Sequence, residues 1–328
     1  MSRPKRRFGD RQVCAIGFGA MSFAGFFGAA DDDVSMATLA AVVDAGIDHW
    51  DTANIYGMGR SEQIIGRYFS EVGDPGVHLA TKASIIPGPP RRFSNDRDHL
   101  RSELDGSLKR LNRDKVDLFY AHRKEAERPI EELAETMAGL IDEGLIDGYG
   151  LSEVSPGTIK RAHAVHPVTA VQNEYSLWTR LPELGVIQTC AALGITFVPF
   201  SPVARGAFGR HNVNPAEWAD GDFRKAIPRF IEPNWSLNRQ TIDALRDLAT
   251  AKGVTLPALA LAWILSRNDT MVPIPGTRTA EHMRDWLPAL DMTLTKNDLA
   301  QIDRIAPVGW AYGDRYSEAA NIGPERYS

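Results

Sequence analysis

Short apolar segments alternate with amphipathic helical segments along almost the whole sequence, and this alternation constrains the fold most strongly. Eight ranges suit buried strands: residues 14–19, 47–51, 77–81, 116–121, 146–151, 170–173, 196–200 and 271–274. The intervals carry helical periodicity; in one of them Leu100, Leu104, Leu108 and Leu111 share a face. Apolar strands separated by helices are typical of parallel βαβ units. The sequence therefore predicts an α/β fold, a closed (β/α)8 TIM barrel.

Three segments lie outside this repeat. Residues 8–13, with Gly9-Asp10 as the turn, predict a short N-terminal hairpin. Residues 201–236 and 307–328 are irregular, and the second range predicts an irregular C-terminal tail. No shift in composition marks a linker, so residues 1–328 are predicted to form a single barrel domain.

Three successive predicted strands end in a titratable residue. Asp51 ends one strand, with Tyr56 five residues later, and Lys82 and His122 follow the next two strands. Singly, each has a plainer explanation, such as a helix cap for Asp51 or a satisfied core histidine for His122. Active sites of (β/α)8 barrels lie at the carboxyl ends of the strands. We therefore expect these four side chains to converge in a catalytic site.

The four residue types suggest a reduction assisted by a proton donor. A free tyrosine has a pKa of about 10, and a nearby ammonium such as that of Lys82 is expected to lower it. Asp51 is a suitable counter-ion for a buried Lys82, and His122 can orient a substrate oxygen. None of these groups is a reductant, so a cofactor must supply the hydride.

Charge and cysteine usage exclude several classes of protein. The net charge of −5 argues against a general nucleic-acid partner. Cys14 and Cys190 are the only cysteines, which excludes a disulfide framework and fits a reducing, cytoplasmic location. No stretch of about 20 uninterrupted apolar residues is present, so no membrane partner is expected. The oligomeric state is not predicted.

Two other patterns in the sequence suggest alternative sites. Gly17-Phe18-Gly19, at the end of the first predicted strand, suggests a dinucleotide fingerprint, but the third glycine is misplaced and no clean acidic strand end follows. His49, Asp51 and His122 suggest a metal-dependent hydrolase, yet metal barrels usually need more converging ligands.

Seven motifs together resemble the aldo-keto reductase superfamily over nearly the whole chain. They are Asp51-Thr52-Ala53 with Tyr56-Gly57, Ala80-Thr81-Lys82, Asp117-Leu118 with His122-Arg123, Gly150-Leu151-Ser152, Val171-Gln172-Asn173-Glu174-Tyr175-Ser176, Phe200-Ser201-Pro202 and Ile274-Pro275-Gly276-Thr277-Arg278. The likeness is strongest to the microbial and plant-type branch that reduces small aldehydes and ketones. It implies an NADP(H)-dependent oxidoreductase that forms an alcohol, with Tyr56 as general acid. Some relatives are instead regulatory subunits of membrane complexes, and that alternative stays open.

The resemblance also implies how the cofactor is held. Residues matching Ser152 and Gln172 hold the nicotinamide carboxamide, and Phe200, followed by Ser201, stacks on the ring. Gly276, Thr277 and Arg278 match the loop that grips the 2′-phosphate of NADP(H), for which a guanidinium is well suited. The chain departs from the family pattern at Glu153, His282 and Asp285-Trp286, which affects the expected adenine contacts. Candidate substrate contacts are Phe26, Trp178, Tyr312 and Tyr316.

Overall fold

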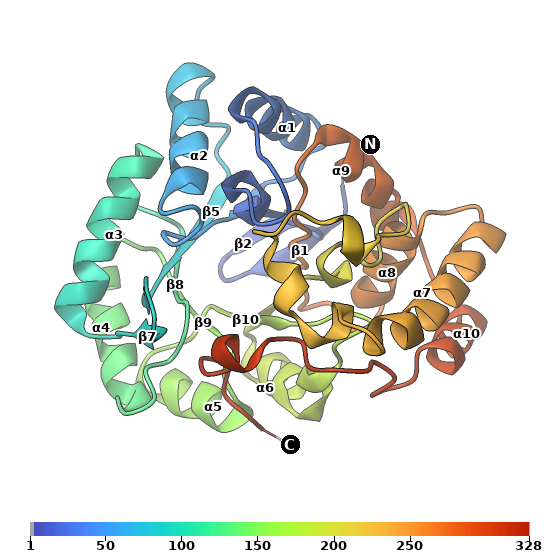
Figure 1. Cartoon of the computed structure of the whole chain (residues 1–328). Coiled ribbons are helices and arrows are strands. Elements are labelled where there is room, and N and C mark those ends of the chain that lie inside the picture. Colours follow the sequence, from blue (N-terminus) through green and yellow to red (C-terminus); the bar gives the residue numbers. More distant parts are fainter. Residues whose placement is uncertain (1–2, 328) are drawn as a thin grey trace.

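Seven parallel strands form the barrel wall in the computed structural model, which describes residues 3–327 (Figure 1). The strands are β3 (Phe18–Gly19), β4 (His49–Asp51), β5 (His78–Ala83), β8 (Leu118–Ala121), β9 (Tyr149–Ser152), β10 (Ala170–Glu174) and β11 (Thr196–Phe200). Their order in the sheet follows their order in the chain, and every neighbouring pair is parallel. The predicted parallel α/β architecture is confirmed.

The eighth predicted strand, residues 271–274, is replaced by an extended segment that makes isolated bridges. Val272 and Ile274 donate backbone hydrogen bonds to β11, and the carbonyls of Pro273 and Pro275 accept from the β3 side, at 2.9 to 3.2 Å. Because the two prolines have no N–H, they cannot return a bond toward β3, and a regular ladder does not form. The segment still closes the barrel between β11 and β3.

Ten α-helices are present among residues 3–327, and they surround the sheet (Figure 1). They are α1 (Asp32–Asp44), α2 (Arg60–Glu71), α3 (Arg97–Leu111), α4 (Ile130–Asp142), α5 (Pro156–Val165), α6 (Val186–Leu193), α7 (Asn234–Ala251), α8 (Leu256–Leu265), α9 (Ala280–Trp286) and α10 (Lys296–Ile305). Side-chain caps fix several starts, including Asp96 before α3 and Thr295 before α10. The leucine face predicted for α3 is buried.

Two predicted helices are shorter than expected. Residues 182–193 divide into a 3₁₀ turn and α6, because Gly185 adopts a φ of 125° between them. Residues 279–290 divide into α9 and a second 3₁₀ turn, Leu287–Asp291, whose Pro288 cannot continue a helix.

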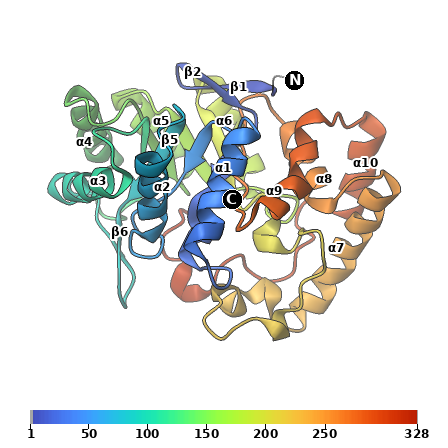
Figure 2. The same cartoon turned by 90° about the horizontal axis from the view of Figure 1, so that it is seen from above.

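The two ends of the barrel differ. The predicted N-terminal hairpin is present as β1 (Lys5–Phe8) and β2 (Arg11–Cys14), and it covers one end. Figure 2 shows this hairpin on the opposite side of the molecule from the segment between β11 and α7 and from the C-terminal tail. A second hairpin, β6 (Ile85–Ile86) with β7 (Arg92–Phe93), lies between β5 and α3. The end away from β1 and β2 is therefore where the long loops gather.

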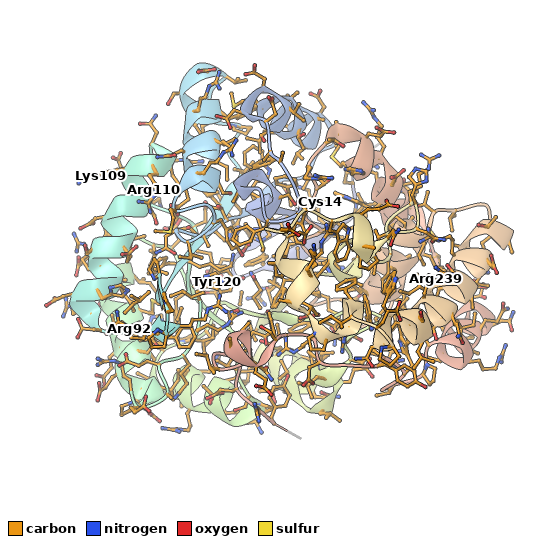
Figure 3. The ribbon with its side chains drawn as sticks, viewed as in Figure 1. Cys14, Arg92, Lys109, Arg110, Tyr120 and Arg239 are labelled. Carbon is orange, nitrogen blue, oxygen red and sulfur yellow. The ribbon has the colours of Figure 1, made fainter. Side chains whose placement is uncertain are left out.

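Tyr120 lies at the centre of the barrel (Figure 3) and packs in the cluster of side chains that fills its interior. A Cβ on Gly150 would come within 2.3 Å of the Tyr120 ring, so only glycine fits on the facing strand.

Among the described residues, no single helix has the length and apolarity needed to cross a membrane; α7 and α8 meet the criterion only jointly and are bent by 89°.

Candidate active site

The structure brings together the four titratable residues that the sequence places near strand ends. Lys82 lies inside β5, with its side chain fully buried. Its ammonium donates to Oδ1 of Asp51, the last residue of β4, and to the Thr52 carbonyl at 2.7 Å. Strands β4 and β5 are parallel neighbours, so their carboxyl ends meet and the pair forms across the ladder. A buried ammonium thus has the counter-ion that burial requires.

Tyr56 completes this group from the loop after β4. Its ring centroid lies 5.1 Å from Lys82 Nζ, and its ring meets the His122 ring edge-on with centroids 5.8 Å apart. Phe26 packs against the other side, with ring centroids 6.1 Å apart. A phenol, an ammonium and an imidazole therefore share one small volume above the barrel.

The balance of effects on Tyr56 differs from the expectation of a lowered pKa. Burial raises the pKa of Tyr56 above its usual value, and Lys82 opposes only part of that rise. The expectation counted the ammonium but not the loss of water around the phenolate. The phenol consequently keeps its proton at neutral pH.

His122 is buried and neutral. Burial lowers the pKa of His122 well below its usual value, and the charges of Arg123, Lys82 and Arg91 lower it further. Among the residues that the structure describes, its Nδ1 atom has no hydrogen-bond partner. Such an imidazole can donate or accept one hydrogen bond with a bound molecule without a change of charge.

Gln172 contacts the carboxylate of the group. From β10, its side-chain amide donates to Asp51 Oδ2 at 2.9 Å. Burial raises the pKa of Asp51, while Lys82 and Gln172 act in the opposite direction by stabilising the ionised form. Both carboxylate oxygens therefore have a donor, and Asp51 is held rigidly.

A cavity of about 330 Å³ opens beside Tyr56. Eight predicted site residues line it: Asp51, Tyr56, Gln172, Phe200, Ser201, Gly276, Thr277 and Arg278. Lys82, His122 and Ser152 do not line it. Other lining residues include Arg205, Arg210 and Arg224, which sequence reasoning did not select, and Trp286, which it noted only as a departure from the family pattern. The first three come from the irregular segment between β11 and α7, where no periodic pattern indicates which side chains face inward.

The cavity wall near α9 suits an anion. Arg278 lies against Gly28, where an added Cβ would come within 2.7 Å of the guanidinium. Among the described residues, Arg278 pairs with no carboxylate, and Thr279 caps α9 directly after it. Asp285, near the end of α9, is paired with Arg210 at 3.1 Å. A phosphate at Arg278 would therefore meet one free cation and an acid already neutralised.

The departure at Glu153 has a structural explanation. Glu153 follows β9 with a φ of 60°, an unfavourable conformation for a glutamate. Its carboxylate is buried and pairs with Arg315 of the C-terminal tail, which also reaches Glu174 at 3.3 Å. Although burial raises it, Arg205 and Arg315 together lower the pKa of Glu174 to about 2. This ion network attaches the tail to the mouth of the barrel.

Ser152, a predicted cofactor-binding residue, accepts a hydrogen bond from Arg123 in the structure. The Arg123 guanidinium donates to Ser152 Oγ at 3.2 Å, to the His122 carbonyl at 2.6 Å and to the Tyr316 hydroxyl at 3.4 Å. Tyr316 is one of the candidate substrate contacts named from the sequence. Of the others, Trp178 packs in an aromatic cluster with Trp310, and Tyr312 is 51% exposed. Arg123 was not selected from the sequence, although it follows His122 directly.

The residues that suggested a metal-dependent hydrolase are directed toward other partners. His49 faces His78, with the two Nδ1 atoms 2.9 Å apart, whereas Asp51 faces Lys82. Within residues 3–327, no three His, Cys, Asp or Glu side chains are grouped so as to hold a metal ion.

Comparisons with known proteins agree with the fold and the motifs. The model of the Aldo/keto reductase family matches residues 15–307. The NADP(+) aldo-keto reductase yakc of Schizosaccharomyces pombe is 36% identical over 98% of this chain and 96% of its own length. A probable aldo-keto reductase 1 of Glycine max is 35% identical over 93% of this chain and 89% of its own.

Solved structures show the same likeness. A glycerol dehydrogenase from Gluconobacter oxydans superposes with a TM-score of 0.84 at 26% identity, covering 93% of this chain and 95% of its own. An aldo/keto reductase from Klebsiella pneumoniae in complex with NADP and acetate gives a TM-score of 0.73 at 25% identity, over 94% of this chain and 96% of its own.

Proposed function

The chain belongs to the aldo/keto reductase family, and from this premise we propose that it reduces a small aldehyde or ketone to an alcohol with NADPH, using Tyr56 as the general acid. One observation carries the proposal. The Tyr56 phenol lines a cavity whose wall near α9 suits an anion, and a buried ammonium and a neutral imidazole lie next to that phenol.

Tyr56 supplies the proton in this proposal. The hydroxyl carries its proton at neutral pH, and Lys82 opposes the rise in the pKa of Tyr56 that burial causes, which favours transfer of the proton to the carbonyl oxygen. The Lys82 ammonium, 5.1 Å from the ring, stabilises the phenolate that the transfer leaves. Asp51 in turn keeps Lys82 charged and in place.

His122 orients the substrate. Its ring meets that of Tyr56 edge-on, so a hydrogen bond from its imidazole would hold the carbonyl oxygen near the phenol. Burial and the surrounding cations keep the imidazole uncharged, so it does not compete with Tyr56 as the acid.

The cavity fits a nicotinamide dinucleotide, which when bound supplies the hydride. Phe200, Ser201 and Gln172 line the cavity and would hold the nicotinamide end. Arg278 and Thr277 line the part near α9, where a 2′-phosphate would find an unpaired guanidinium and the start of a helix. NADPH is therefore preferred over NADH. This preference is also consistent with the NADP(+) in the name of the yeast relative.

A panel of neutral aldehydes and ketones tests this function. The purified protein is mixed with each compound and NADPH, and the loss of NADPH absorbance is followed against a control without the carbonyl. We expect turnover with several members and much slower turnover with NADH. If no member is reduced while the protein is folded and binds NADPH, the proposed activity is wrong.

We further propose that the chain acts as a single domain in the cytoplasm, on a small carbonyl compound and without a nucleic-acid or membrane partner. The support is that Cys14 and Cys190 are both buried and free, and that burial raises the pKa of the Cys190 thiol to about 12. Neither cysteine is placed for a disulfide. Cell fractionation that recovers the protein in the membrane or exported fraction would contradict this location.

A further inference from the structure

Arg123 differs from the other arginines that are buried to the same degree. Four arginines within residues 3–327 are at most 9% exposed: Arg123, Arg180, Arg205 and Arg224. The last three each form an ion pair with a carboxylate, at 2.6 to 2.9 Å. Arg123, at 8% exposure, pairs with no carboxylate in the part of the chain that the structure describes.

The contacts of Arg123 are neutral oxygens only. They are the His122 carbonyl, Ser152 Oγ and the Tyr316 hydroxyl, and the last of these is a long contact of 3.4 Å. Removing a cation from water without providing a counter-ion is strongly unfavourable, which is why buried charges are normally paired. Within this chain, Arg180, Arg205 and Arg224 follow that rule.

The position of Arg123 connects this missing anion to the substrate. It follows His122 directly, and its charge acts on both His122 and Tyr56. The other cations that act on His122 are Lys82, already paired with Asp51, and Arg91, an exposed residue between β6 and β7. The surroundings of the proposed proton donor therefore carry a net positive charge that no carboxylate of the described chain neutralises.

If the protein has the proposed function, the cofactor does not supply the anion that Arg123 lacks. Ser152, which accepts from Arg123, matches the family position that holds the uncharged carboxamide end of the nicotinamide. The anionic phosphates belong toward Arg278, on the α9 side of the cavity. The remaining molecule that can bring an anion to Arg123 is the carbonyl substrate.

We infer that Arg123, with the Tyr316 hydroxyl beside it, binds a carboxylate on the substrate, so that the enzyme prefers aldehydes or ketones that carry a carboxylate. A guanidinium offers two parallel N–H donors that match the two oxygens of a carboxylate. Tyr316 comes from the C-terminal tail, and Gly323 of the same tail lies against the Arg123 stem, where an added Cβ would come within 3.0 Å of Cδ. The tail thus contributes to substrate selection. This inference rests on the proposed function.

Matched pairs of substrates test the inference. Each pair is a carboxylate-bearing aldehyde and its uncharged methyl ester: 4-carboxybenzaldehyde with methyl 4-formylbenzoate, the 3-substituted pair, and 4-oxobutanoate with methyl 4-oxobutanoate. Values of kcat/KM are measured with NADPH at pH 7 in low salt. We expect the acid of the best pair to exceed its ester by roughly ten- to a hundredfold, mainly through a lower KM, as one or two charge-assisted hydrogen bonds would give.

Variants assign the preference to Arg123. Arg123→Met should lower kcat/KM for the acid at least about tenfold more than for the ester. Arg239→Met is the matched control, because it removes the same charge from an exposed position on α7, away from the barrel centre (Figure 3), and it should leave both values unchanged. Tyr316→Phe removes only a hydroxyl and should lower the same acid-to-ester ratio by a smaller factor.

Inhibition keeps the test decisive if Arg123→Met does not fold. Benzoate should inhibit the reduction of a neutral ester by wild-type protein competitively with the ester, and benzamide at the same concentration should not. If the esters are reduced as well as the acids in every pair, or benzoate and benzamide inhibit alike, the inference is wrong and the reductase function stands. If neither acids nor esters nor neutral aldehydes are reduced, the proposed function itself fails.

Discussion

The side-chain amide of Gln172 donates a hydrogen bond to Oδ2 of Asp51 at 2.9 Å, across the mouth of the barrel from β10 to β4. The family resemblance assigns Gln172 to the nicotinamide carboxamide. The structure adds a second contact, because the same amide satisfies the carboxylate that holds Lys82. Cofactor position and the charge of the catalytic group are therefore linked through one side chain.

Replacing Gln172 should destabilise the fold. Gln172→Met leaves a carboxylate oxygen of the buried Asp51 without its donor, and a hydrogen bond to a charged group contributes about 1.5–3 kcal/mol. We expect the free energy of unfolding in urea to fall by about that amount. Gln188→Met is the matched control at an exposed position, and it should change little. Equal stability of the two variants would show that the contact with Asp51 is unimportant.

Removal of Lys82 should affect stability and activity separately. Lys82→Met leaves Asp51 buried without its counter-ion, which in comparable buried pairs costs about 3–5 kcal/mol. Adding Asp51→Asn removes the uncompensated charge, so the double variant should recover stability in urea denaturation but not NADPH oxidation. Lys115→Met, at a pair on the surface, should cost under about 1 kcal/mol. Recovery of activity in the double variant would contradict the role given to Lys82.

The N-terminal end of the barrel should make the fold sensitive to acid. Burial lowers the pKa of His78 to about 4 and that of its partner His49 well below the usual value. The unfolded chain therefore binds more protons than the folded one below about pH 6.5, and stability is lost as the pH falls from there toward about 4.

Each of the two histidines can contribute a slope of up to about 1.4 kcal/mol per pH unit in that window. Urea denaturation at intervals between pH 4 and pH 7 measures the slope. His78→Gln should reduce it, and His282→Gln, at an exposed histidine, should leave it unchanged. A slope that is the same in all three proteins would contradict the prediction.

Arg278 should decide the choice of cofactor. Arg278→Ala removes the unpaired guanidinium at the α9 side of the cavity, so it should weaken NADPH binding roughly ten- to a hundredfold and NADH binding far less. Titration of both cofactors by tryptophan fluorescence measures this, with Arg284→Ala, exposed on α9, as the control. Wild-type protein that binds NADH as tightly as NADPH would show that no 2′-phosphate site exists there.

Features that repeat with a regular period could be predicted from the sequence. The leucines of α3 and the apolar strands follow from helical and strand spacing, and the meeting of Asp51 with Lys82 follows from neighbouring parallel strands. The prediction of a regular eighth strand at residues 271–274 was wrong, although the segment is apolar. Pro273 and Pro275 lack the N–H groups that a regular ladder needs.

Contacts between distant segments could not be predicted. Arg315 and Glu153 are 162 residues apart, and nothing in their spacing indicates that they pair. Arg123 follows His122 in the sequence, but its missing counter-ion is evident only after the partners of the other buried arginines are known. The pKa of Tyr56 depends on how completely the fold removes water, which a motif does not record.

Reduction of a neutral aldehyde with NADPH by Tyr56→Phe tests the central claim most directly. The substitution removes one oxygen atom and leaves the ring that contacts His122, so fold and NADPH affinity should be retained. Loss of a positioned general acid predicts that kcat falls by at least about 10²–10⁴-fold. Tyr68→Phe, at a tyrosine on α2 outside the site, should keep wild-type turnover. Turnover in Tyr56→Phe equal to that of the wild type would contradict the assignment of Tyr56 as the proton donor.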